Sequence, residues 1–209
     1  MEKIKLFSPE SKPYDLTYGQ WTVKWWQWLL SKPKHTNPAI DDTGKNAAID
    51  QNDQNVWFLA GTFVNMPIPH RRCTIPAGKA ILFPVINYQA NFLEDPNFTD
   101  GSELKKHVNL DIDDIVEKEA FVDGIKVPVY RVGSEPSLFP VDIAQDIPHG
   151  VNGADDGSTI SIGGITEAVS DGYWVFLKPL PSGKHDLHFM GSCGGGIRRT
   201  VAYYHLTVE

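Results

Sequence analysis

Cysteine is scarce in this chain of 209 residues, with only Cys73 and Cys193 present. Two cysteines cannot form the framework of bridges that stabilises small secreted domains, and they cannot form a paired-cysteine zinc motif. A chain of this length can bury enough apolar surface to fold without bridges or a structural metal. We therefore expect an ordinary globular protein whose stability comes from its core.

Basic charge is also in deficit, with 19 Lys and Arg against 26 Asp and Glu and a net charge of -7. Nucleic acids and anionic membranes are bound through basic surfaces, so neither is expected as a partner. No apolar run is long enough to span a bilayer. Residues 1–16 carry charges and prolines instead of the apolar core of a signal peptide, so we expect a cytoplasmic protein.

The familiar motifs of nucleotide and hydrolase chemistry are missing as well. The sequence has no P-loop, dinucleotide-binding glycine fingerprint, zinc-protease helix or serine nucleophile elbow. We therefore expect no cofactor, and the sequence leaves both the reaction, if there is one, and the oligomeric state open.

Tryptophan, in contrast, is abundant, and four of the six tryptophans lie between Thr17 and Ser31. On a helical projection this segment is apolar over most of its circumference, which predicts a helix buried on most sides. Thr17 and Gln20 have the spacing of a capping box at its start, and Pro33 ends it. The helix is expected to leave only a narrow polar strip to solvent: Gln20, Lys24, Gln27 and Ser31.

Short apolar runs alternate with turn signals through the rest of the chain, which is typical of a β-sandwich. The runs 56–60 and 80–86 are apolar throughout, as expected for strands buried on both faces. A second helical pattern occurs near 102–118. The sequence thus predicts a mainly β protein, an immunoglobulin-like or jelly-roll sandwich formed by residues 17–209 with two helical additions, preceded by an N-terminal arm of residues 1–16.

Several motifs resemble a family of uncharacterised microbial proteins of similar length. They are Trp21…Trp25-Trp26-Gln27-Trp28, then 56–61 (VWFLAG), then 73–79 (CTIPAGK) with 83–87 (FPVIN), then 171–174 (DGYW) with 182–185 (SGKH). The resemblance covers most of the chain and implies no activity, so it supplies no catalytic residue. Separately, residues 180–208 are similar to the last two strands of many immunoglobulin-like sandwiches, which bears on fold alone.

Paired arginines near each cysteine suggest an anion pocket. Arginines can fork onto a carboxylate or phosphate, and the backbone N–H groups of the glycine-rich segment after Cys193 can form an anion-binding nest. If the two segments meet, they form a positive pocket with a reactive thiol. The predicted ligand residues are Arg71, Arg72, Cys73, Cys193, Gly194, Gly195, Arg198 and Arg199. The alternative is a hairpin turn with inert buried cysteines and arginines paired with carboxylates.

A metal site is a second hypothesis. Asp186 and His188 share one face of a predicted strand, and His205 could lie beside them on the next strand. One carboxylate and two imidazoles form a known catalytic metal set, which would make the protein a metal-dependent hydrolase-type enzyme. The function that we favour from the sequence is a non-catalytic binding or interaction protein with a small-anion pocket; the metalloenzyme and a purely structural interaction module are the alternatives.

Overall fold

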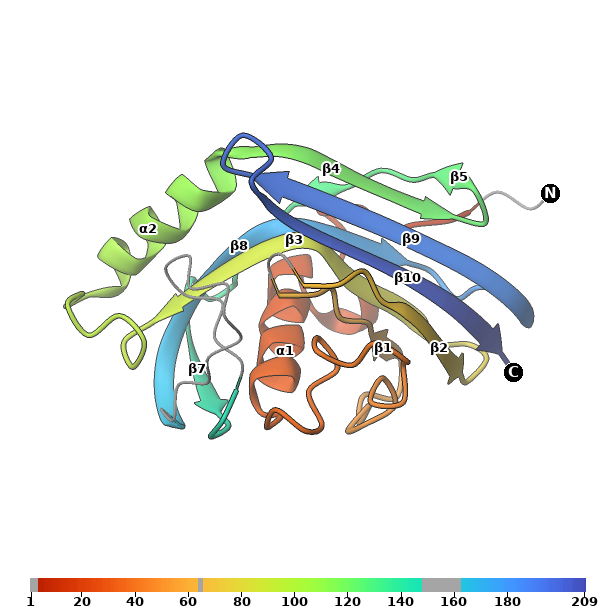
Figure 1. The fold of residues 1–209 in the computed structure, drawn as a ribbon, viewed down its shortest axis with the longest axis horizontal. Helices are drawn as coiled ribbons and strands as arrows, with labels where there is room; N and C mark the ends of the chain where they lie inside the picture. The colour runs from red at the N-terminus through yellow and green to blue at the C-terminus, as the bar shows by residue number, and fades with distance from the viewer. Residues whose placement is uncertain (1–3, 64–65, 148–162) are drawn as a thin grey trace.

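The computed structural model describes residues 4–63, 66–147 and 163–209. Three layers are stacked in the molecule (Figure 1). Helix α1 (Tyr18–Leu30) and the loops around it cover one face of a central sheet, sheet A. A second sheet, sheet B, and helix α2 (Gly101–Asp113) cover its other face. The predicted mainly β fold, a sandwich with a Trp-rich helix, is confirmed.

Sheet A has the strand order β1-β3-β8-β6, and β7 also pairs with β8. Strand β1 runs parallel to β3, and the other pairs are antiparallel. The bounds of its strands are Val56–Phe58 for β1, Ala80–Asn91 for β3, Tyr130–Arg131 for β6, Leu138–Ile143 for β7 and Gly164–Leu177 for β8.

Sheet B has the order β2-β10-β9-β4-β5, with β2 parallel to β10 and antiparallel pairing elsewhere. Its strands are β2 (His70–Ile75), β4 (Ile115–Val122), β5 (Ile125–Lys126), β9 (Gly183–Cys193) and β10 (Arg198–Val208). The two sheets pack face to face through one hydrophobic core, because side chains alternate between the two faces of each strand.

Helix α1 begins as the sequence predicts. The Thr17 side chain accepts a hydrogen bond from the Gln20 backbone at 3.2 Å, and Gln20 Oε1 accepts one from the Thr17 backbone at 2.8 Å. Its tryptophans also fix neighbouring segments, because three indole N–H groups donate to backbone carbonyls outside the helix. These bonds run from Trp21 to Pro13 (2.8 Å), from Trp25 to Leu59 (2.9 Å) and from Trp28 to Ile49 (2.9 Å).

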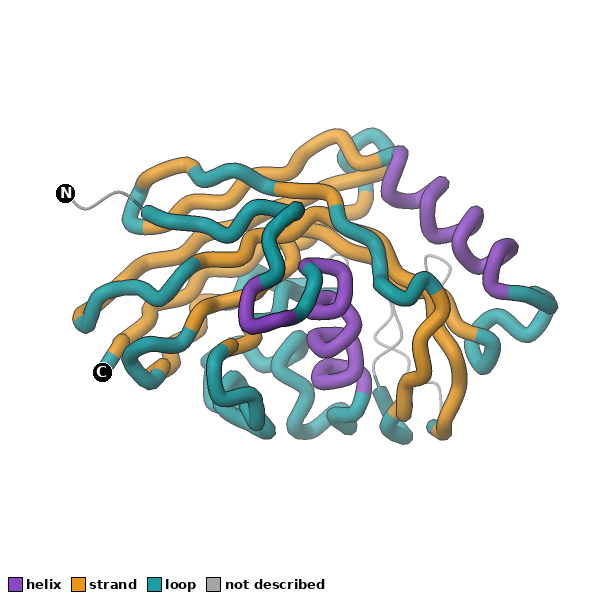
Figure 2. The backbone as a smooth tube through the Cα atoms, turned by 180° about the vertical axis from the view of Figure 1, so that it is seen from behind, coloured by secondary structure: helices purple, strands orange, loops and turns teal. Residues whose placement is uncertain are grey.

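Helix α2 differs from the prediction at its C-terminal end. It runs without a break through Asn109 and ends at Asp113, and the chain from Ile115 onward forms strand β4 instead of continuing the helix to 118. Strand pairing decides this boundary, because β4 adds to β9 along most of its length. Viewed from behind in Figure 2, α1 lies among the loops whereas α2 lies at one end of the strands.

The N-terminal arm is also more ordered than its sequence suggests. The Phe7 backbone N–H donates to the Phe176 carbonyl at 2.9 Å, and Leu6 forms a bridge with Leu177. A short helical turn, η1 (Pro13–Asp15), then leads into α1. Both described α-helices have 13 residues, and none in the described chain combines the length and apolar character needed to cross a membrane.

Candidate functional site

The side of sheet B that faces away from sheet A, hereafter the outer face, gathers the polar and aromatic residues that the sequence singled out. On β10, Tyr204 and Leu206 point into the core, so Tyr203 and His205 between them point outward. The same alternation places Asp186 and His188 outward on β9. Neither helix covers this face, because α1 packs on sheet A and α2 packs on β3 and β8. The outer face therefore presents three of the seven histidines of the chain, His70, His188 and His205.

Four rings form a continuous stack across this face, hereafter the ring row: His70 on β2, Tyr203 on β10, His188 on β9 and Phe121 on β4. They occupy adjacent positions in the strand register. The ring centroids are 4.6 Å apart for His70 and Tyr203, 4.1 Å for Tyr203 and His188, and 5.8 Å for His188 and Phe121, with planes within 12° of parallel. Because the faces cover one another, solvent meets ring edges, which carry imidazole nitrogens and a hydroxyl. The row therefore suits a hydrogen-bonding ligand better than one that stacks on a ring face.

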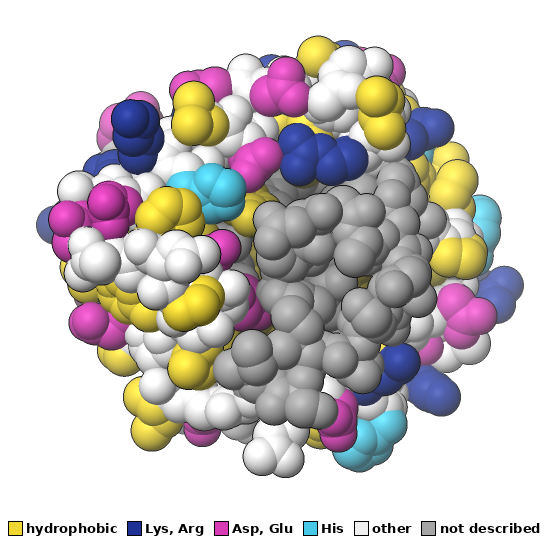
Figure 3. Space-filling view, turned by 60° about the vertical axis from the view of Figure 1, so that its left-hand side comes forward, with side chains coloured by type: hydrophobic (Ala, Val, Ile, Leu, Met, Phe, Trp, Pro, Cys, Tyr) yellow, Lys and Arg dark blue, Asp and Glu magenta, His cyan; other side chains and the backbone are white. Residues whose placement is uncertain are grey.

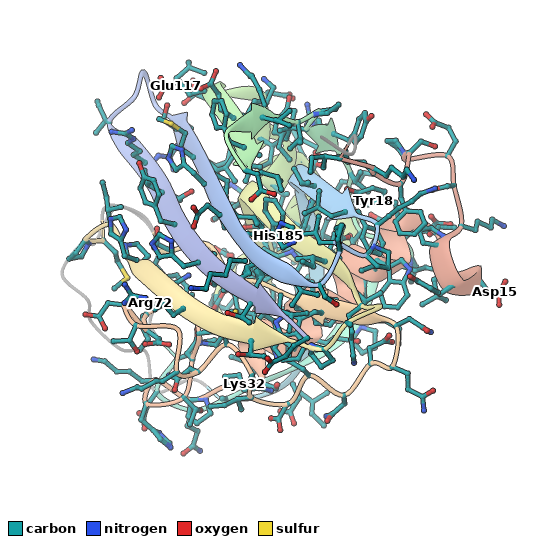
Figure 4. All side chains as sticks on the ribbon, turned by 90° about the vertical axis from the view of Figure 1, so that its right-hand side faces the viewer. Asp15, Tyr18, Lys32, Arg72, Glu117 and His185 are labelled. Atoms are coloured by element: carbon teal, nitrogen blue, oxygen red, sulfur yellow. The ribbon has the colours of Figure 1, made fainter. Side chains whose placement is uncertain are left out.

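A second row lies beside the ring row and carries charge. Arg72, His205 and Asp186 occupy adjacent positions on β2, β10 and β9. His205 Nδ1 lies 2.6 Å from Asp186 Oδ1, and the His205 ring lies 6.0 Å from that of His70. The guanidinium of Arg72 has no ion-pair or hydrogen-bond partner in the part of the chain that the structure describes. Arg72 thus offers an available guanidinium in register with His205 and two residues from His70, and it lies on the other side of Figure 4 from Tyr18.

Arg71, the neighbour of Arg72, is instead buried and hydrogen-bonded within the protein. Its side chain is 1% exposed, and Tyr204 Oη accepts a hydrogen bond from it at 2.8 Å. The guanidinium also donates to four backbone carbonyls at 2.6–3.0 Å, those of Ala39, Asp41, Ala60 and Gly61. Arg71 therefore ties the long polar loop and the segment after β1 to β10, and its donors are not available to a ligand.

The two cysteines lie at different ends of sheet B. Cys73 is in register with Leu206, and Cys193 is in register with Arg198, eight positions earlier on β10. At about 3.3 Å per residue, this separates them by about 26 Å. Both thiols are free. Burial raises the pKa of the Cys73 thiol to about 12 and also raises that of Cys193, although Arg71 and Arg198 oppose the respective shifts. The predicted pocket with an activated thiol is therefore not assembled.

Donor groups at the glycine-rich turn bind carboxylates of the protein itself. The Gly194 backbone N–H donates to Asp114 Oδ2 at 2.6 Å, and Arg198 Nη2 donates to Asp111 Oδ1 at 3.1 Å. Gly194, Gly195 and Gly196 have positive φ angles of 61°, 64° and 91°, which glycine adopts readily. Arg199 lies on the outer face, where its Nη2 is 3.9 Å from Met190 Sδ. Arg198 therefore agrees with the alternative to an anion pocket, in which the arginines near this turn pair with carboxylates.

The predicted metal ligands lie on one face but do not converge. Asp186 and His205 are paired, whereas His188 is two positions along β9 and stacks on Tyr203. Within the described residues, no three or more His, Cys, Asp or Glu side chains are grouped so that they could hold a metal ion. The set Asp186, His188 and His205 therefore does not form the predicted metal site in this structure.

Sequence reasoning missed His70, Tyr203 and Phe121 as members of the site. A period-two pattern was present at 70–75, where His70, Arg72 and Thr74 are exposed and Ile75 is buried. Arg71 hid this pattern, because a charged residue occupies an inward position where an apolar residue is expected. The stack also needs four strands from distant parts of the sequence in register, which local patterns do not specify.

The long polar loop at 32–54 is held by packing and by local hydrogen bonds. The carboxylate of Asp41 accepts from the backbones of Thr43 and Asn46 at 2.9 and 2.8 Å. Burial opposes them, but together these bonds lower the pKa of Asp41 below its ordinary value. The loop borders an open cleft of about 590 Å³ in which basic and acidic side chains alternate, among them Lys34, Asp42 and Lys45.

Comparison of the chain with models of protein families, with curated proteins and with solved structures gives no match.

Proposed function

We propose that this protein is a non-catalytic binding protein and that the outer face of sheet B takes a small anionic ligand. Arg72, His70 and His205 are the basic contacts in this proposal. The observation that carries it is the exposed Arg72, whose guanidinium lacks a partner among the described residues. Arg72 is in register with His205 and two residues from His70 on the same face of sheet B. A guanidinium fork matches the geometry of carboxylate, sulfate and phosphate.

The ring row fixes the orientation of one histidine of this site, His70. Stacking holds His70 against Tyr203, so the edge of the imidazole is already oriented when an anion arrives. His205 is oriented in turn by its 2.6 Å contact with Asp186. Because the whole chain carries a net charge of -7, the attraction is local and does not come from a generally basic surface.

The experiment is a sulfate titration at constant ionic strength, with chloride as the balancing ion and the histidine ring signals followed by NMR. We expect saturable shifts for His70 and His205 in the wild type, and their loss in Arg72→Ala. Arg72→Lys keeps the charge but not the fork and is expected to bind more weakly than the wild type.

The matched control is Lys184→Ala, which removes one positive charge from the exposed end of β9. This variant is expected to retain the wild-type response. If Arg72→Ala and Lys184→Ala respond equally, the effect reflects total charge and the proposed site is wrong.

A further inference from the structure

A second, smaller cleft lies between α2, strand β8 and the segment that joins β6 to β7. Its lining residues are distant in sequence from Arg72. Its volume is about 290 Å³, at the small end of ligand sites in proteins. The lining comes from three separate parts of the sequence, with Lys105 and Asn109 on α2, Ser137 in the connecting segment, and Val169 and Asp171 on β8.

Two residues that line this cleft, Arg131 and Asp171, form an ion pair, and Arg131 also pairs with Asp113. Arg131 Nε and Nη2 both lie 2.8 Å from Asp171 Oδ2, and Arg131 Nη1 donates to Asp113 Oδ1 at 2.5 Å. The Gly172 backbone N–H donates to the second Asp171 oxygen at 2.7 Å. These three contacts fix the Asp171 carboxylate in place, and of its roughly four acceptor positions one remains for a hydroxyl donor.

Three donor side chains in the lining of the cleft, those of Lys105, Asn109 and Ser137, are unused. Lys105 and Asn109 are one turn apart on α2, so their side chains lie one above the other on the same side of the helix. Over the described ranges, neither of them has a hydrogen-bond or ion-pair partner, and the same holds for the Ser137 hydroxyl. Figure 3, in which the side of α2 comes forward, shows acidic and basic side chains interspersed over the described surface.

We propose that this cleft is a separate binding site for a small anionic polyol, a molecule that combines one phosphate or carboxylate group with hydroxyl groups. The Lys105 ammonium binds the anionic group, and the Asn109 amide and the Ser137 hydroxyl donate to it. The carboxylate of Asp171, which lines the cleft, accepts from a hydroxyl group of the ligand. Val169, which is buried at the floor of the cleft, contacts its carbon atoms.

Glycerol phosphate is the probe, and glycerol and inorganic phosphate represent its two halves, each titrated into the full-length protein by calorimetry at constant ionic strength. Glycerol phosphate is expected to bind more tightly than either half. Lys105→Met is expected to weaken it by about tenfold, because a charge-assisted hydrogen bond is lost. Lys106→Met is the matched control, since it removes the same charge from the neighbouring exposed position of α2, and it is expected to leave binding unchanged.

Equal weakening in Lys105→Met and Lys106→Met, or no binding of glycerol phosphate to the wild type, would overturn the proposal. Arg72→Ala separates this site from the outer face: it is expected to abolish the sulfate response of the histidines and to leave glycerol phosphate binding intact. Each variant is first compared with the wild type by thermal unfolding, so that a loss of binding is not confused with a loss of structure.

Discussion

Tyr203 and His188 lie on neighbouring strands of sheet B with ring centroids 4.1 Å apart and planes within 5° of parallel. Burial lowers the pKa of His188, and the positive charge of Arg199 lowers it further, against the opposing effect of Glu119. The stacked imidazole is therefore held in its neutral form at neutral pH, and the ring row has no charge at its centre.

This lowered pKa predicts how stability depends on pH. The unfolded chain binds a proton at this position at a higher pH than the folded protein does, so stability falls as the pH drops below the unfolded pKa of about 6.5. His188→Phe is expected to reduce this acid-side loss, as measured by the melting temperature between about pH 5 and pH 8.

His185 provides the opposite case, and its removal is a control. Burial works against the shift, but the hydrogen bond with Asp123 and that with the Pro181 carbonyl raise the pKa of His185 overall. The stability that protonated His185 contributes is present below the pKa that this residue has in the unfolded chain. It is lost as the pH rises through the pKa of His185 in the folded protein. His185→Gln is thus expected to cost more at acidic than at neutral pH. The same pH profile for both variants would contradict the assignment of the two environments.

Adjacent arginines should differ sharply in their effect on stability. Arg71→Met removes the guanidinium donor from four backbone carbonyls and the Tyr204 hydroxyl, and of these carbonyls the one of Ala60 still accepts from Tyr204 Oη. We therefore expect a loss of about 3 kcal/mol or more in the free energy of unfolding. Arg72→Met changes an exposed side chain and is expected to stay within about 0.5 kcal/mol of the wild type. Urea unfolding measures both, and similar losses would show that the clamp formed by Arg71 is not structural.

Trp25 tests the role of the N-terminal helix. Its ring is 2% exposed and meets that of Trp174 edge to face at 5.2 Å. Trp25→Ala is expected to cost about 3–5 kcal/mol, because it removes a large buried side chain and leaves a cavity. Lys24→Ala, on the exposed side of the same turn, is expected to cost far less. Denaturant unfolding followed by circular dichroism compares the two, and equal costs would argue against α1 as part of the core.

The thiols should be slow to react in the native protein. Thiolate is the reactive form, and the raised pKa values of Cys73 and Cys193 leave little of it near neutral pH. We expect alkylation by iodoacetamide to accelerate strongly on unfolding, and mild oxidation to give no intramolecular bridge, because the two cysteines lie at different ends of the sheet. Rapid alkylation of the folded protein, measured by mass spectrometry, would show that the burial of these thiols is incomplete.

Patterns of neighbouring residues predicted the parts of the fold that depend on interactions between residues close in sequence. The capping box at Thr17 and the apolar circumference of the following turns defined α1, and the apolar runs at 56–60 and 80–86 marked buried strands of sheet A. The C-terminal end of α2 was missed because Ile112 and Ile115 fit a helical period equally well, and only pairing with β9 shows that Ile115 belongs to a strand.

The candidate site depended on information that local patterns lack. The sequence identified Arg72, His188 and His205 as polar residues of interest, but it combined them with the wrong partners. Arg71 and Arg72 are chemically identical and adjacent, and only the strand alternation sends one into the core and the other to solvent. The distance between Cys73 and Cys193 follows from the parallel pairing of β2 with β10, which the sequence does not reveal.

The Trp-rich helix has a consequence for how the chain is made. Trp25 packs against Trp174, which follows it by 149 residues (174 − 25). At about 5–20 residues per second, a ribosome takes about 7–30 s to add that length of chain. During this time α1 has left the ribosome but β8, which covers it, has not been synthesised. The apolar surface of α1 that packs on β8 therefore stays uncovered for this interval, and exposed apolar surface of this kind promotes aggregation of a nascent chain.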